Sequence, residues 1–325
     1  MRNSKVRAAL IFSAIGFVLF LVSNRVDELR VYQGAEVAVY VVAISAIVLL
    51  TGYSGQISLG HGALMAVGAY AAVLSRNYWN LPIPLTFVAA VLAAALFGAV
   101  LGVAAGRLTG PYLAGTTLAL AVGLPSLANE FGFLGGEQGL TYDVGLPPTW
   151  LGADFTQYKW FFWISALAAL IITWLTYNIL GSRFGRSWRA LRSNPTSAAL
   201  AGIHVGRSKV LAFTISSGLA GLAGALLAMT ISLVTPSAFP LSLSFTIVTG
   251  AVLAGVTLLT GSIVGAIVLV AIPELTGSLA AHLGGSEKVT ANLPGLMTSA
   301  LLILSVLFFP NGQKLNWRKG KKSSR

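Results

Sequence analysis

A glycine-rich, uncharged stretch lies between two long apolar runs, and residues 51–62 of it read TGYSGQISLGHG. Each of its four glycines costs up to about 1 kcal/mol relative to alanine inside a helix, so the stretch is a poor helix former. Between Arg30 and Arg76 the only charged residue is Glu36, which is unlike an ordinary solvated loop. The stretch therefore predicts either a broken helix that lines a solute path at membrane depth or a tight cytoplasmic turn with close helix packing.

The composition places the whole chain in a membrane. Of its 325 residues, 56% are hydrophobic and 9% are charged, against about 25% charged residues in a soluble domain. The mean hydropathy is +0.81. A soluble enzyme is excluded, and the lack of cysteine excludes disulfides and thiolate metal sites.

Apolar runs of about 20 residues predict membrane-spanning helices. We expect an all-α, polytopic membrane protein with about ten spans and a range of eight to eleven. We expect one transmembrane domain over residues 1–309, followed by a basic tail at 310–325. The predicted spans are 7–23, 31–50, 57–75, 85–105, 109–128, 159–180, 210–233, 243–260, 262–281 and 294–309.

The charges predict the orientation of these spans. The chain has 21 basic and 9 acidic residues, which gives a net charge of +12. If the N-terminus is cytoplasmic, the cytoplasmic segments hold 16 of the basic residues and no acidic residue, as the positive-inside rule requires. We therefore expect both termini and the loop 181–209 to be cytoplasmic, and the loop 129–158 to be external. The net charge then reflects orientation and contact with anionic lipid, and nucleic-acid binding is not expected.

The cytoplasmic loop 181–209 contains the signals of a short helix. Asn194 is a good N-cap and Pro195 suits the first helical position. Residues 196–201 would form the helix, and Gly202 would end it. Such a helix suits a groove on another protein, whereas the alternative is an amphipathic helix that lies on lipid headgroups.

Two other features are less specific. The external loop 129–158 is acidic; it would dock a partner protein, gate the external mouth or simply be solvated. A second glycine-spaced stretch in the other half of the chain weakly indicates an internal repeat. Two further sets of glycines are interpreted as helix-packing faces. The second stretch has Gly250, Gly255, Gly261 and Gly265, and the packing sets are Gly98, Gly102 and Gly106, and Gly218, Gly221 and Gly224.

Five motifs in order resemble the permeases of branched-chain amino acid ABC transporters, and most closely the LivM-type subunit. The resemblance runs from about residue 35 to 315. The motifs are residues 51–61, Gly110-Pro111-Tyr112 with Thr117-Leu118-Ala119, Gly135-Gly136 with Gln138-Gly139-Leu140, residues 189–213 with Arg189, Arg192 and Asn194, and Pro273-Glu274-Leu275 with Phe309-Pro310-Asn311-Gly312.

The resemblance implies an importer subunit in the cell membrane that moves branched-chain or other hydrophobic amino acids. It implies a second, LivH-like permease chain, two cytoplasmic ATPase subunits and an external solute-binding protein, with ATP and magnesium used only by the ATPases. The implied substrate path contains Tyr53, Gly55, Gln56, Ser58, Gly60, His61, Gly135, Gly136 and Gln138. The implied ATPase coupling segment contains Arg189, Arg192, Asn194, Pro195, Ala198, Ala199 and Gly202.

Catalytic chemistry is not expected in this chain. It has no P-loop motif for ATP, and its three histidines lie far apart in the sequence, so no metal site is predicted.

Two alternative functions stay open. Related permeases serve urea, short amides or aromatic acids. A secondary transporter or channel would instead need its own ion site, for which Glu36 and Glu274 are the candidate carboxylates.

Overall fold

A computed structural model describes residues 25–107, 110–152, 155–253 and 255–282, together with isolated positions at 16, 23, 293, 295–297, 299–301, 303, 304 and 307. Apart from those isolated positions, the predicted first span 7–23 and last span 294–309 lie outside the described residues. The predicted tail 310–325 lies wholly outside them.

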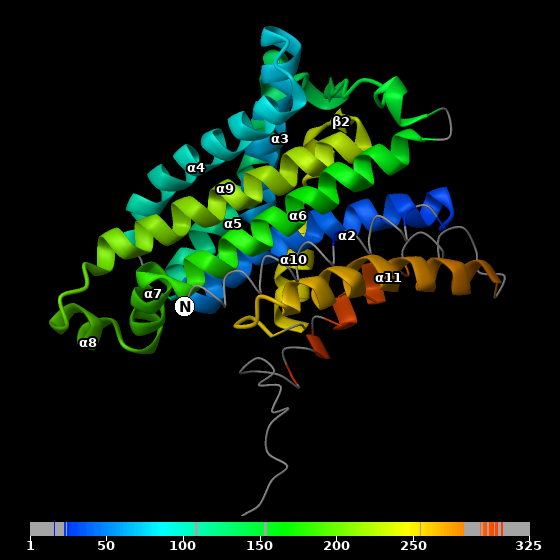
Figure 1. Cartoon of the computed structure of the whole chain (residues 1–325). Helices are drawn as coiled ribbons and strands as arrows, with labels where there is room; N and C mark the ends of the chain where they lie inside the picture. The colour runs from blue at the N-terminus through cyan, green and yellow to red at the C-terminus, as the bar shows by residue number, and fades with distance from the viewer. Residues whose placement is uncertain are drawn as a thin grey trace, which may run out of the picture.

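The described chain is almost entirely helical (Figure 1). The long helices are α2 (Glu28–Ile47), α3 (His61–Trp79), α4 (Ile83–Arg107), α5 (Pro111–Glu130), α6 (Gln157–Gly181), α9 (Val205–Ile231), α10 (Leu241–Leu253) and α11 (Gly261–His282). The short helices are α7 (Arg183–Ser193) and α8 (Pro195–Leu200), and a π-helical turn, η1 (Val48–Tyr53), continues α2. The single-turn 3-10 helices are η2 (Gly132–Leu134), η3 (Gly136–Gln138), η4 (Thr149–Leu151) and η5 (Pro236–Ala238), and the strands are β1 (Leu140–Thr141) and β2 (Leu233–Val234).

Six of the helical segments in the described part are long and apolar enough to cross a membrane, or seven if the bent pair of α5 with the following 3-10 turns counts as one span. The prediction of an all-α polytopic membrane protein is confirmed. α3 is not among these segments, because it carries His61, Arg76 and Asn77. Most of its residues are buried between other helices, so it has little need of a lipid-facing apolar surface.

Two predicted boundaries were wrong. The span predicted at 57–75 begins only at His61, since the chain is irregular from Ser54 to Gly60. The span predicted at 243–260 ends at Leu253. Soon afterwards Gly255 has a φ of +86°, a conformation that ends helices and that glycine adopts without strain.

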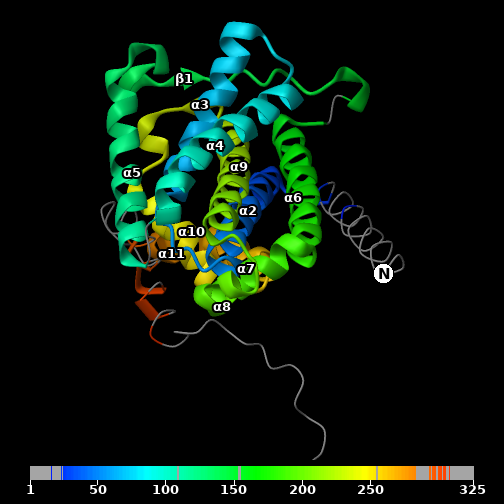
Figure 2. The same cartoon turned by 90° about the vertical axis from the view of Figure 1, so that its left-hand side faces the viewer.

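The loops gather at two opposite ends of the helix bundle (Figures 1 and 2). The end that we call the coupling end holds α7, α8 and residues 54–60 and 255–260, and α7 lies beside both of these segments. At the other, the loop end, the segment 131–152 covers the α3–α4 turn and the end of α9. Backbone and side-chain contacts there include Arg76 Nε to Asp143 O at 3.0 Å, and β1 pairs antiparallel with β2. The predicted cytoplasmic and external loops therefore lie at opposite ends.

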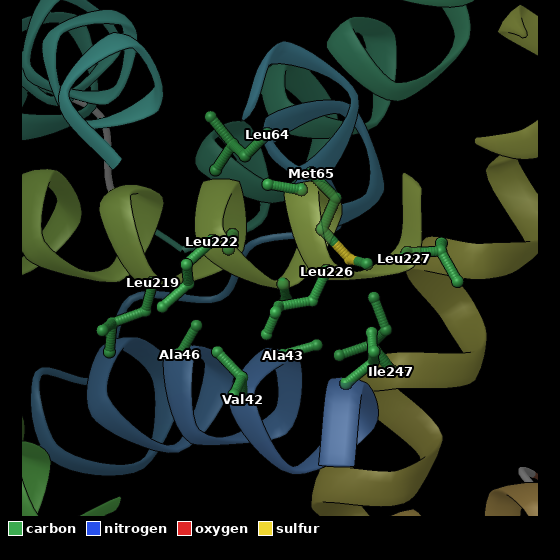
Figure 3. Packing of buried hydrophobic residues seen from close by; sticks show 14 of the residues in the cluster. Val42, Ala43, Ala46, Leu64, Met65, Leu219, Leu222, Leu226, Leu227 and Ile247 are labelled. Carbon is green, nitrogen blue, oxygen red and sulfur yellow. The ribbon is translucent and has the colours of Figure 1, made fainter. Parts of the chain in front are cut away.

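The core forms where α3 and α10 pack on α2 and α9 (Figure 3). Glycines allow the closest approaches. A Cβ at Gly224 on α9 would collide with the Met65 carbonyl on α3, and a Cβ at Gly98 on α4 would collide with the Ser217 side chain on α9. The interpretation of these glycine sets as packing faces is confirmed at both positions.

Candidate functional site

The glycine-rich segment 54–60 forms an irregular connection between η1 and α3. Wide backbone turns lead into it, with Ser54 N donating to Leu49 O at 3.3 Å and Gln56 N to Leu50 O at 3.2 Å. Gly55 has a φ of +74°, which strains any residue with a Cβ. The sequence therefore predicted the break correctly, and its position is the coupling end of the bundle.

Hydrogen bonds to α9, to α5 and within the segment pair several of its polar groups. Gln56 Nε2 donates to Lys209 O on α9 at 3.1 Å and to Ser54 Oγ at 2.6 Å. On α5, Thr117 Oγ1 accepts from the backbone N of Leu59 at 2.9 Å. Because irregular backbone away from water needs such partners, these bonds explain how a non-helical segment survives inside the bundle.

His61, at the start of α3, is fully buried and links three helices. Its Nε2 lies 2.9 Å from Ser216 Oγ on α9, and the Ser216 hydroxyl donates to Ala46 O on α2 at 2.8 Å. Since the hydroxyl has only one proton, His61 Nε2 must be the donor. Nδ1 is then an acceptor, and it has no hydrogen-bond partner among the described residues. His61 thus fastens α3 to α9 and α2.

The short helix predicted in the loop 181–209 is confirmed as α8. Asn194 Oδ1 accepts from the backbone N of Thr196 at 3.0 Å and of Ser197 at 3.1 Å, and Pro195 is the first helical residue. Gly202 follows with a φ of +84°. The preceding helix α7 is anchored by Trp188, which is fully buried and donates from Nε1 to Ser208 O at 3.0 Å.

The expected role of Ala198 needs a correction. The sequence placed Ala198 with Ala199 on a surface that fits a partner, but Ala198 is only 4% exposed. It is the one buried residue of α8 and packs against its own chain. Ala199 is exposed, and the next residue, Leu200, is 86% exposed. The helix period alone could not decide which side of a six-residue helix faces inward.

α7 touches the glycine-rich break directly. The Arg192 guanidinium donates to Gly52 O, and the Arg192 Cβ would lie 3.3 Å from a Cβ built at Gly55. The guanidinium carbon of Arg189 lies 5.5 Å from the centre of the Tyr53 ring. A cavity of about 300 Å³ opens between them, lined by Gly52, Tyr53, Arg189, Arg192, Ser193 and Thr257. No local pattern in the sequence indicates this contact, which joins residues 140 positions apart.

The second glycine-spaced stretch meets the first at this end. A Cβ at Gly52 would collide with the Val256 carbonyl in the connection between α10 and α11. Within that hairpin, Gly265 lies against the Gly250 carbonyl. The two interruptions therefore form one contact between the two halves of the chain.

The residues predicted to line the substrate path do not come together. Gln56, Ser58, Gly60 and His61 are buried inside the chain. The other group, at the loop end, belongs to the turns η2 and η3 and includes Gly135, Gly136 and the exposed Gln138, with φ values of +84° and +55° at the two glycines. Tyr53 alone of this set lines the cavity beside α7.

The two carboxylates of the predicted spans, Glu36 and Glu274, lie on neighbouring helices, which the sequence did not reveal. Helix α2 packs against α11, which brings Glu36 within range of electrostatic interaction with Glu274. This pair is the strongest structural feature in favour of a self-sufficient, ion-coupled transporter.

Comparison with known proteins identifies the family of the chain. Residues 34–306 match the family model described as "Branched-chain amino acid transport system / permease component". The chain belongs to this family. The match covers every helix from α3 to α11 and most of α2, so the glycine-rich break and α7–α8 both lie inside it.

Individual relatives agree with the family. The high-affinity branched-chain amino acid transport system permease protein LivM of Escherichia coli K12 is 30% identical over 242 residues, which are 67% of this chain and 56% of LivM. LivH of the same transport system and strain is 27% identical over 285 residues, 81% of this chain and 87% of LivH. The autoinducer 2 import system permease protein LsrC of Salmonella typhi is 26% identical over 226 residues, 61% of each chain. The chain thus spans little more than half the length of LivM, and no solved structure matches it.

Proposed function

We propose that the chain is a permease subunit of an ABC importer that moves branched-chain or other hydrophobic amino acids into the cell. The family match and the similarity to both LivM and LivH support this proposal. The observation that carries it is the direct contact of α7 with the glycine-rich break through Arg192 and Gly52. A chain without a nucleotide site needs such a contact, because its motion must come from another subunit.

In this proposal the chain lies in the cell membrane with about ten spans and both termini in the cytoplasm. The coupling end faces the cytoplasm, because the arginines of α7 lie there and basic residues are retained inside. The loop end, with the acidic segment 129–158, then faces outward and receives the external solute-binding protein.

The outer face of α8 is the contact for the ATPase subunits, which use ATP and magnesium. On this face the apolar side chain of Leu200 is exposed, and Pro195 and Ala199 lie exposed beside it. Ala198 holds the helix to its own chain instead. A push on α8 passes through α7 and Arg192 to residues 52–60.

The segment 52–60 acts as an inner gate in this account, held closed by bonds to α5, α9 and α7. Its buried polar side chains would be exposed to solute only when α7 moves. Gly135, Gly136 and Gln138 would contact solute at the external mouth. The second permease chain, LivH-like, completes the path.

Co-purification tests the ATPase contact. Leu200→Glu should abolish co-purification of the ATPases and stop leucine uptake, since it places a charge in an apolar contact. Leu146→Glu is the matched control for co-purification, because Leu146 is 84% exposed at the opposite end, and it should retain the ATPases. Normal ATPase binding by Leu200→Glu would contradict the proposed contact.

The solute needs a separate measurement. Competition against labelled leucine by isoleucine, valine, urea, an aromatic acid and autoinducer 2 separates the candidate solute classes. We expect inhibition by isoleucine and valine only. Inhibition by urea or by autoinducer 2 alone would reassign the substrate while leaving the transport class intact.

A further inference from the structure

A long apolar groove opens between the beginnings of α4 and α6, which stand on either side of α9 (Figure 2). Its volume is about 620 Å³. Nine of its ten lining residues are apolar or aromatic, and the tenth is an arginine. The lining residues are Arg76, Pro82, Ile83, Pro84, Phe87, Trp160, Ile164, Leu167, Ala168 and Ile171.

The length of the groove matches one leaflet of a bilayer. Along α6 it extends from Trp160 to Ile171, which at 1.5 Å per residue is about 16 Å. Half of the hydrocarbon core of a membrane is about 15 Å. Leu167 and Ile171 are both exposed, so the groove is open to its surroundings along this length.

Arg76 lies at the loop end of the groove, and some of its N–H groups donate to none of the described residues. Its Nε donates to Asp143 O at 3.0 Å and its Nη1 to Leu81 O at 3.1 Å. A guanidinium has five N–H groups, so Nη2 has no partner among the described residues. The two bonds fix the guanidinium in place, and the remaining donors suit an anion.

Trp160 lines the same groove and carries an indole N–H. It contacts Phe155 edge to face, with ring centroids 6.5 Å apart, and its indole N–H has no acceptor among the described residues. Tryptophan is enriched where a membrane meets water, since its ring is apolar and its N–H is polar. Arg76 and Trp160 together place the polar end of a ligand at the headgroup level.

We propose that this groove binds an anionic glycerophospholipid, with one acyl chain along α6 and the phosphate at Arg76. A transported amino acid does not fit the lining, because no carboxylate there would pair with its ammonium group. The positive charge of Arg76 favours a lipid with net negative charge over a zwitterionic one. The inference is independent of the proposed transport function, since it rests on α4, α6 and Arg76 alone.

Native mass spectrometry of the purified full-length chain, with any partner subunits that accompany it, tests this site. The chain is equilibrated with phosphatidylglycerol and phosphatidylcholine. The wild type should retain phosphatidylglycerol preferentially. Arg76→Gln should lower its affinity about tenfold, the loss expected for one hydrogen bond to a charged group. Arg30→Gln, an exposed arginine at the beginning of α2, is the matched control and should bind like the wild type.

Two further variants separate lipid binding from loss of structure. Arg76→Lys keeps the charge and should retain most of the binding. Ala168→Trp fills the groove without touching Arg76 and should also expel the lipid, whereas Leu175→Trp, on α6 outside the groove, should not. Equal phosphatidylglycerol retention by Arg76→Gln, Ala168→Trp and wild type would overturn the proposal. So would cross-linking from Ala168→Cys to a second copy or a partner permease, because a protein helix would then fill the groove.

Discussion

Replacing Arg192 by alanine removes the bond between α7 and the glycine-rich break. Arg192 donates to the Gly52 carbonyl, and a hydrogen bond that involves a charged group contributes about 1.5–3 kcal/mol net. If that bond transmits the motion of α7, its loss should lower leucine uptake about 10- to 150-fold. Binding of the ATPases should not change, because their proposed contact is the outer face of α8.

The assay measures labelled leucine uptake and ATP hydrolysis on the same reconstituted complex. Arg192→Ala should hydrolyse ATP without matching uptake. Arg186→Ala is the control on the same helix, since Arg186 is exposed and its one hydrogen bond to the described residues is to Gly181 O, at 3.4 Å. Similar uptake by the two variants would refute the idea that Arg192 connects α7 to the gate. Loss of the ATPases from Arg192→Ala would instead place Arg192 in the subunit contact.

Three other predictions concern the break, the topology and the external loop. Gly60→Leu should abolish uptake while the protein still inserts, because its Cβ would lie 2.8 Å from a backbone carbonyl of α5. Gly123→Leu is the control and should transport, since Gly123 has open space around it. Equal uptake by the two variants would refute a close-packed break. An impermeant thiol reagent on intact cells should label Thr141→Cys but not Ser193→Cys, and the reverse pattern would invert the topology. Burial raises the pKa of Tyr142 in the loop 129–158, so the contribution of this tyrosine to stability is present below about pH 10 and is lost as the pH rises further. The unfolding temperature of the wild type should therefore fall more steeply with pH than that of Tyr142→Phe, but only in that alkaline range. Parallel plots of unfolding temperature against pH would contradict this.

The sequence predicted those parts of the fold that depend on local signals. Apolar length predicted the α4, α6 and α11 helices within a few residues, and the Asn194-Pro195 pair predicted the beginning of α8. The break near Gly55 was also visible, because glycine in an uncharged stretch weakens a helix at that place. These signals lie within one turn or one span, so no tertiary information was needed.

The remaining features depend on contacts between distant segments. Nothing local indicates that Arg192 reaches Gly52, or that His61 bonds to Ser216 on another helix. The inward orientation of Ala198 depends on how α8 packs on its own chain. Similarly, the groove at Arg76 exists only because α4 and α6 begin on either side of α9, and no spacing in the sequence encodes that arrangement.

Measuring which energy source drives uptake is the most direct test of the central claim, that this chain is a permease driven by separate ATPases. The complex is reconstituted in vesicles, and leucine uptake is measured with ATP on the side of α8 and the solute-binding protein on the opposite side. The account predicts uptake that requires ATP and persists when an ionophore collapses the membrane potential. Uptake that proceeds without ATP, ceases with the ionophore and is lost in Glu36→Gln would contradict the account and assign an ion-coupled transporter.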